Sequence, residues 1–158
     1  MSSSHTPRVV THAAVDARGD SQRIEHDLTA WKSFLRAEDR RCDELHLAAA
    51  LVTIGLRSAG DFASACDVLD GVLRPTDRIG VLCPDELSVL LLPVADIHDA
   101  QRTVQQIDAA LRVASIEAHV GWAMRLDGHG LFHAAARADA AMLTAKGHGH
   151  GHLDLSKR

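Results

Sequence analysis

The longest apolar stretch of the sequence runs from Leu45 to Leu56, and it limits the folds that the chain can adopt. It includes the β-branched segment Val52–Ile54, which favours extended backbone. A strand that is apolar on both of its faces must be covered on both, as a strand inside a sheet is. The stretch therefore predicts a buried central strand, with Gly55 and Arg57-Ser58 marking its end.

Amphipathic periodicity predicts a helix on each side of this strand. Ile24 to Arg41 places apolar residues at helical spacing with charged residues between them. We expect this helix to pack on the body of the domain or on a second subunit. After the strand, Asp61 to Leu73 repeats apolar residues at helical intervals and stops before Pro75.

The second half of the chain predicts a hairpin followed by further helices and strands. Pro84 marks the hairpin turn, because proline has no amide hydrogen for a ladder. Asp96 is expected to cap the next helix. The expected elements are hairpin strands 78–82 and 87–92, a helix 96–111, a strand 116–124, a helix 130–146 with Gly147 as its C-cap, and a last strand 150–155. One sheet covered by helices, an α+β fold or α/β sandwich, satisfies this order.

Composition excludes several classes of protein. The 158 residues are enough for one domain with a core, and 46% of them are hydrophobic. Aromatic residues make up only 3%, there is no Tyr, and the formal net charge is −4. Few stacking platforms and no extended basic surface argue against a nucleic-acid partner.

Cysteine usage and the chain ends predict the compartment. The three cysteines are scattered without metal-site spacing, which indicates free thiols and a cytoplasmic location. No signal peptide and no membrane-spanning stretch are expected. Residues 1–20 are polar and without period, so they predict a flexible N-terminal tail that precedes a single domain of residues 21–158.

Several short motifs in this domain occur in the order and at the spacing of a known family. They are His26–Ala30, Gly60-Asp61, Arg74–Asp77, Leu90–Pro93, Arg137–Met142 and Ala145-Lys146. Together they make the chain similar to the GGDEF family, the diguanylate cyclases. The resemblance implies a palm-like mixed sheet covered by helices, here shortened after the first strand. It also implies cyclic di-GMP signalling.

The signature loop departs from the family pattern, so we expect a degenerate member that is not an enzyme. The loop reads Cys83, Pro84, Asp85, Glu86 and Leu87. Its family counterpart has two glycines that let the backbone approach phosphates, whereas proline fixes φ and removes a donor. Asp85 stands at the position that carries metal in the family. A solvated hairpin turn is the alternative explanation of Asp85 and Glu86.

The remaining catalytic positions are also changed. Thr53 and Gly55 stand where the resemblance implies two acids, and Mg²⁺ prefers carboxylates, so no cofactor and no Mg²⁺ are expected. The segment that would read the guanine edge is missing before Asp61. Asp61, Lys146 and His150 are left as a vestigial GTP site, in which His150 replaces an Arg. Asp61 is alternatively a helix cap, and Lys146 an ordinary helix-terminal cation.

Arg74 and Asp77 are the best candidates for ligand binding. In the family, R-x-x-D binds cyclic di-GMP as an inhibitory site, with the Arg on phosphate and guanine and the Asp accepting from the guanine edge. The family's further Arg is replaced here by Gln105-Gln106, and Arg102 lies one turn earlier. The alternative is a salt bridge that braces the start of the hairpin.

Three functions remain open from the sequence. The first is a catalytically inactive regulatory domain that binds cyclic di-GMP through the R-x-x-D site. The second is an interaction or dimerisation module with a protein partner or a homodimer, which an exposed apolar edge with Trp31 and Phe34 would favour. The third is a residual enzyme using Asp85 and Glu86. Separately, alternating His148, His150 and His152 would share one face of a strand and could hold a metal ion.

Overall fold

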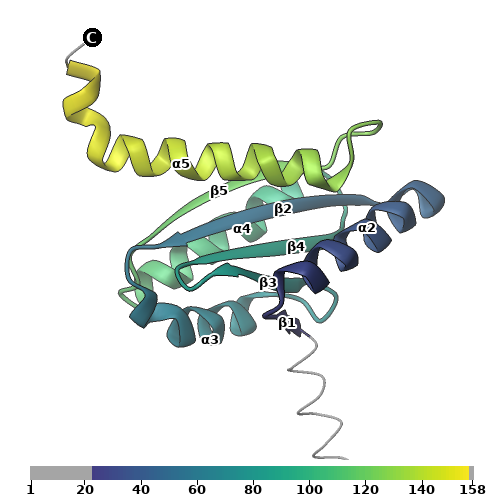
Figure 1. The fold of residues 1–158 in the computed structure, drawn as a ribbon, viewed down its shortest axis with the longest axis horizontal. Coiled ribbons are helices and arrows are strands. Elements are labelled where there is room, and N and C mark those ends of the chain that lie inside the picture. Colours follow the sequence, from purple (N-terminus) through teal and green to yellow (C-terminus); the bar gives the residue numbers. More distant parts are fainter. Residues whose placement is uncertain (1–22, 157–158) are drawn as a thin grey trace, which may run out of the picture.

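The computed structural model describes residues 23–156, with side chains from residue 23 to residue 147. A mixed sheet of five strands, in the order β1-β3-β4-β2-β5, forms its centre (Figure 1). The elements are β1 (Ile24–Glu25), α2 (Leu28–Leu45), β2 (Ala48–Leu56), the 3-10 turn η2 (Ala59–Asp61), α3 (Phe62–Val72), β3 (Arg78–Cys83), β4 (Glu86–Val94), α4 (Ile97–Val113), β5 (Ala118–Met124) and α5 (Gly130–Ser156). The predicted α+β fold is confirmed. The predicted tail, residues 1–20, lies outside the described residues.

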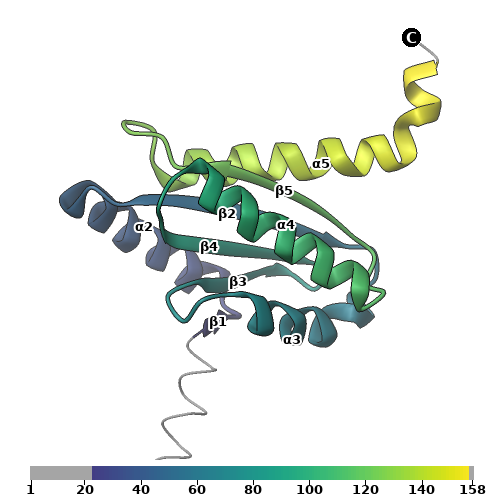
Figure 2. The ribbon, with the colours of Figure 1, turned by 180° about the vertical axis from the view of Figure 1, so that it is seen from behind.

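The apolar stretch forms the central strand, as predicted. β2 lies between β4 and β5 and pairs antiparallel with both. Its side chains alternate between two cores: Ala50, Val52 and Ile54 face α3 and α4, whereas Ala49 and Leu51 face α2 and α5. Figure 2 shows α3 and α4 on the face of the sheet away from α2.

The first helix begins and ends later than predicted. Ile24 and Glu25 form a short strand parallel to β3, because the edge of β3 offers them hydrogen-bonding partners. Asp27 then caps α2 by accepting from the amide of Thr29 at 2.9 Å. At the other end α2 continues to Leu45, which had been expected in the strand and is 58% exposed. His46 ends the helix in the left-handed conformation.

Trp31 fixes α2 on the sheet. Its side chain is only 2% exposed, and a Cβ added at Gly80 of β3 would lie 2.2 Å from the indole. The strand therefore needs a glycine there to let the ring approach. Phe34 stacks on Trp31 with ring centroids 5.5 Å apart. Trp31 is thus a core residue, and the exposed apolar edge that would have favoured an interaction module does not include it.

The C-terminal helix is longer than predicted. α5 runs from Gly130 to Ser156, so the predictions of a C-cap at Gly147 and of a strand at 150–155 are wrong. A strand needs a neighbouring sheet edge for its hydrogen bonds, whereas a helix satisfies its own. The end of α5 projects beyond the sheet in both views (Figures 1 and 2). The expected strand face for the alternating histidines is therefore absent from the described backbone.

Candidate functional site

The signature loop forms the tight turn of the β3–β4 hairpin, as predicted. The Cys83 thiol donates a hydrogen bond to Asp85 Oδ1 at 3.1 Å, and this bond raises the pKa of Cys83. The Asp85 carbonyl accepts from the amide of Leu56 at 2.7 Å, which ties the turn to the end of β2. Leu87 is fully buried and belongs to the core. The loop is thus a turn held by its own polar groups.

Thr53 and Gly55 lie on the face of β2 that α5 covers. Thr53 is 2% exposed, and its hydroxyl donates to Asp139 Oδ1 of α5 at 2.8 Å. A Cβ at Gly55 would lie 2.9 Å from Met142 Sδ, so a larger residue at this position requires Met142 to move. An acidic side chain at position 55 would be in conflict with the packing of α5 on the sheet.

Three carboxyl groups lie near these two positions. Glu86 is the cross-strand neighbour of Gly55. Burial raises its pKa, the charges of Asp139 and Asp85 add to the rise, and Lys146 opposes it. Within the described residues, no group of three or more His, Cys, Asp or Glu side chains is arranged to hold a metal ion. Thr53 and Gly55 themselves offer no carboxylate to a divalent metal.

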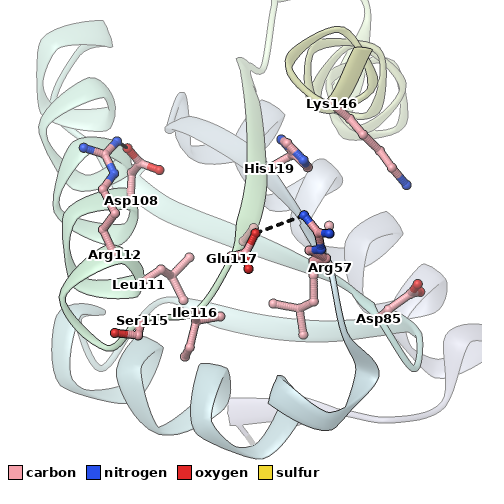
Figure 3. A pocket seen from close by; sticks show the side chains of 13 residues that line it. Arg57, Asp85, Asp108, Leu111, Arg112, Ser115, Ile116, Glu117, His119 and Lys146 are labelled. Carbon is pink, nitrogen blue, oxygen red and sulfur yellow. Dashed lines mark hydrogen bonds and ion pairs between the residues drawn. The ribbon is translucent and has the colours of Figure 1, made fainter. Parts of the chain in front are cut away.

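A groove of about 810 Å³ opens beside the hairpin turn, between β2, β5 and the end of α4 (Figure 3). It contains two residues expected from the sequence, Asp85 and Lys146, and Lys146 extends from α5 towards Asp85. Arg57, which sequence reasoning missed, lines the groove and pairs with Glu117 of the neighbouring chain segment at 3.1 Å. Positive and negative side chains are both present, so the groove is not selective for one sign of charge.

Asp61 does not join this groove. It occupies the N-cap position of α3, but its side chain makes no capping hydrogen bond. Its φ of −88° and ψ of 2° are not the extended angles of a capping residue. Ser58 instead caps the preceding 3-10 turn by accepting from the amide of Gly60 at 3.2 Å. The described structure therefore does not bring Asp61 together with Lys146, and the side chain of His150 lies outside the described residues.

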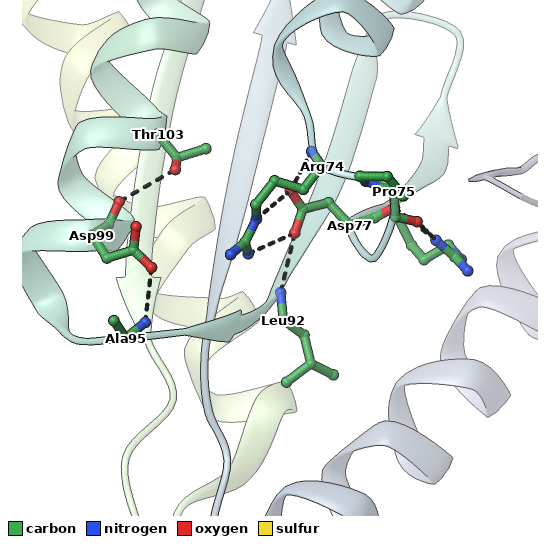
Figure 4. A network of polar contacts seen from close by, with 8 residues as sticks. Arg74, Pro75, Asp77, Leu92, Ala95, Asp99 and Thr103 are labelled. Atoms are coloured by element: carbon green, nitrogen blue, oxygen red, sulfur yellow. Dashed lines mark hydrogen bonds and ion pairs between the residues drawn. The ribbon is translucent and has the colours of Figure 1, made fainter.

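Arg74 and Asp77 contact each other directly (Figure 4). Arg74 Nη2 lies 2.9 Å from Asp77 Oδ1, and Arg74 Nε lies 3.2 Å from Oδ2. The amide of Arg74 also donates to Oδ2 at 2.9 Å, and the amide of Leu92 donates to Oδ1 at 3.3 Å. Each carboxylate oxygen thus accepts two hydrogen bonds. Accepting from a guanine edge stays a prediction for Asp77, and it would require one of these bonds to break.

Arg102 joins this region through Asp99. It lies 3.5 Å from Asp99 Oδ1 on α4, and its side chain is 65% exposed. The hydrogen bond with Asp77 chiefly raises the pKa of Arg74, and the charge of Asp99 adds to the rise. Asp99 at the start of α4 thus pairs with Arg102 and interacts electrostatically with Arg74. The hairpin brace that we considered as an alternative for Arg74 and Asp77 is present.

The architecture matches solved structures of diguanylate cyclases. The diguanylate cyclase SiaD of Pseudomonas aeruginosa, solved with its activator SiaC, aligns at a TM-score of 0.70 and 19% identity over 93% of this chain and 66% of that chain. The GGDEF domain of DgcB from Caulobacter crescentus, in complex with c-di-GMP, aligns at 0.65 and 18% over 77% and 85%. A DGC protein from Thermotoga maritima aligns at 0.67 and 15% over 77% and 98%.

These similarities establish the fold and leave the chemistry to the residues of this chain. No protein-family model matches the sequence, and no curated protein matches it significantly. In the described part of the chain, none of the helices has both the length and the apolar character needed to cross a membrane.

Proposed function

We propose that this chain, which has the fold of GGDEF diguanylate cyclase domains, is a regulatory domain that binds cyclic di-GMP without synthesising it. The observation that carries the proposal is the two-point contact between Arg74 and Asp77. It holds the guanidinium in one orientation while leaving the Arg74 side chain 41% exposed. Nη1 of Arg74 donates no hydrogen bond to the described residues, so it is available to a phosphate oxygen.

Arg102 supplies a second positive charge to the same site. A cyclic dinucleotide carries two phosphates, and two arginines that both interact with the charge of Asp99 suit such an anion. In this proposal Asp77 is buried and orients Arg74, and both of its oxygens already accept hydrogen bonds from the protein. For Asp77 to accept from the guanine edge as well, ligand binding would have to break one of these bonds.

The absence of turnover is part of the proposal. The hydroxyl of Thr53 donates a hydrogen bond to Asp139 and is not a carboxylate. Gly55 has no side chain and so adds no ligand beside Asp85 and Glu86. Without metal-bound charge at these positions, the negative charge that develops in phosphoryl transfer has no counterpart. Incubation with GTP and Mg²⁺ or Mn²⁺, beside an active cyclase, should give no cyclic di-GMP. Product formation would overturn this part.

Binding is tested by calorimetry with cyclic di-GMP on the wild type and on matched arginine variants. We expect Arg102→Ala to weaken binding about tenfold, since a charge-assisted hydrogen bond is lost. Arg112→Ala is the control, because Arg112 lies near the other end of α4 and pairs with Asp108. Arg74→Lys keeps the charge but loses the two-point contact, and should also bind more weakly. No heat at millimolar ligand, or equal affinities of the Arg102 and Arg112 variants, would contradict the receptor proposal.

A protein partner or a homodimer is the second candidate function. It is favoured by two large apolar side chains on helices, Val113 of α4 at 86% exposure and Leu143 of α5 at 58%. Sedimentation of the full chain over a range of concentrations tests the homodimer. A domain that gives no heat with the nucleotide and that dimerises would support this candidate instead.

A further inference from the structure

A small cavity lies between α2 and α5, on the face of the sheet away from α3 and α4. Its volume is about 150 Å³. A cavity of roughly this volume holds one molecule the size of benzene. It is distinct from the Arg74 site and from the groove beside the hairpin turn, because its lining shares no residue with either.

The walls of this cavity are apolar. Trp31 and Leu35 of α2 form one side, and Phe132 and Ala135 of α5 form the other. Phe132 is 41% exposed although it belongs to a helix that packs on the sheet, so its ring is accessible near the mouth. Such walls favour a flat ring or a branched alkyl group.

The floor of the cavity is polar, and part of its hydrogen-bonding capacity is unused. Asp139 Oδ1 accepts from Thr53, whereas Oδ2 accepts no hydrogen bond from the described residues. Ser88 is 4% exposed, and its hydroxyl has no hydrogen-bond partner among them. Neither oxygen is closed off from solvent, so both can accept a hydrogen bond from a donor that enters the cavity.

The charge of the floor selects the kind of donor. Asp139 carries a carboxylate, and Glu86 is near enough to interact with it electrostatically. An anion would be repelled by both, whereas a cation would be attracted. Two positive charges oppose this: Lys32 lies on the lining, and the guanidinium carbon of Arg36 lies 5.6 Å from the ring centroid of Phe132. Both side chains are exposed to water, so their repulsion of a cation at the floor is screened by solvent.

We propose that the cavity binds a small primary amine with an aromatic or branched apolar body. The ammonium group donates to Asp139 Oδ2 and to Ser88 Oγ, and the body packs against Trp31 and Phe132. The site satisfies the two unused polar groups and fills the apolar walls at once. It goes beyond the proposed cyclic di-GMP function, because it uses neither Arg74 nor Arg102.

The two tryptophans of the chain make the site directly observable. Trp31 lines the cavity, whereas Trp122 packs in the core on the opposite face of the sheet. In nitrogen-15 spectra of the full chain, titration with benzylamine should shift the indole N–H signal of Trp31 and leave that of Trp122 in place. Benzyl alcohol, which has the same shape without the charge, should bind at least about tenfold more weakly, and benzoate should not bind.

Variants separate the cavity from a nonspecific effect. Ala135→Met fills the space and should abolish the Trp31 shift, whereas Ala136→Met, at the exposed next position of α5, should leave it unchanged. Ser88→Ala and Asp139→Asn should each weaken the binding of benzylamine while the fold persists. The proposal is overturned if neither tryptophan signal moves, if both move equally, if benzyl alcohol binds as tightly as benzylamine, or if the two methionine variants behave alike.

Discussion

Arg74 donates two hydrogen bonds to the fully buried carboxylate of Asp77, with Nη2 at 2.9 Å from Oδ1 and Nε at 3.2 Å from Oδ2. The amide of Leu92 donates to the same carboxylate at 3.3 Å, so the pair also joins the loop after α3 to β4. One interaction therefore has two consequences: it stabilises the start of the hairpin, and it presents an oriented arginine at the surface. The stability of variants at these positions must therefore be measured as well as their binding.

Asp77→Asn should destabilise the domain. The amide that replaces one oxygen cannot accept, so donors that now reach the carboxylate lose their partner. We expect a loss of about 2 kcal/mol in the free energy of unfolding, measured by urea denaturation. Asp108→Asn is the control, because Asp108 pairs with Arg112 on the exposed side of α4, and it should cost less than about 1 kcal/mol. Equal losses in the two variants would argue against the bracing role of Asp77.

Glycine substitutions should have opposite signs at two positions. Gly80→Ala forces a methyl group into the indole of Trp31, 2.2 Å away, so we expect destabilisation of about 2 kcal/mol. Gly71→Ala adds a methyl group within α3 where nothing lies within 4 Å, and helix propensity should stabilise the protein by about 0.5–1 kcal/mol. Thermal unfolding measures both. A neutral Gly80→Ala variant would mean that α2 packs on β3 less closely than described.

Glu86→Gln should stabilise the domain at neutral pH. Burial raises the pKa of Glu86, and the charges of Asp139 and Asp85 add to the rise. The folded state then binds the proton more tightly than the unfolded chain does, so stability falls as pH rises from about 4.3 through the raised value. The variant should melt higher than the wild type near pH 7, and the difference should vanish near about pH 3.5. Glu44→Gln, at an exposed position of α2, is the control. A pH-independent difference would contradict this assignment.

Arg125→Met should be among the most damaging single changes. The Arg125 side chain is 4% exposed and lies 2.7 Å from Asp39 and 2.6 Å from Asp43. Asp39 also accepts from the amide of Leu131 at 2.9 Å, so the pair links α2, the end of β5 and the start of α5. Arg125 is buried but its partners are partly exposed, at 28% for Asp39 and 68% for Asp43, so losing its charge-assisted hydrogen bonds should cost about 2 kcal/mol. Urea denaturation should show this loss. Arg57→Met, which breaks the exposed pair with Glu117, should cost less than about 1 kcal/mol.

Local patterns predicted the elements well where apolar periodicity was strong. The helix ending before Pro75, the hairpin around Pro84 and the cap at Asp96 all occur in the structure. Predictions failed where the presence or the absence of a distant strand partner decides the backbone. Ile24 and Glu25 pair with β3 instead of opening a helix, and the glycine- and histidine-rich segment after Lys146 stays helical.

The candidate sites divide in the same way. Asp85, Lys146, Arg74 and Asp77 were predicted as site residues because each lies in a short motif. Asp139 was quoted only as part of a motif, and its bond to Thr53 joins residues 86 positions apart. Ser88 lies in no motif that would mark it as a site residue, and only the cavity beside it gives this serine of a buried strand a candidate role. Such contacts depend on how α5 lies across the sheet, which no local pattern encodes.

The sequence by itself determined the layers of this protein and the order of its elements, because alternating and helical apolar spacings specify which face of each segment must be buried. It also determined that positions 53 and 55 carry no carboxylate, since Thr53 and Gly55 are residue identities. Only the tertiary structure decided what the polar residues do: that Asp77 is a saturated buried acceptor, and that Asp139 and Ser88 keep unused capacity. Hydrogen bonding and burial depend on neighbours brought from far along the chain, so they follow from packing and not from spacing.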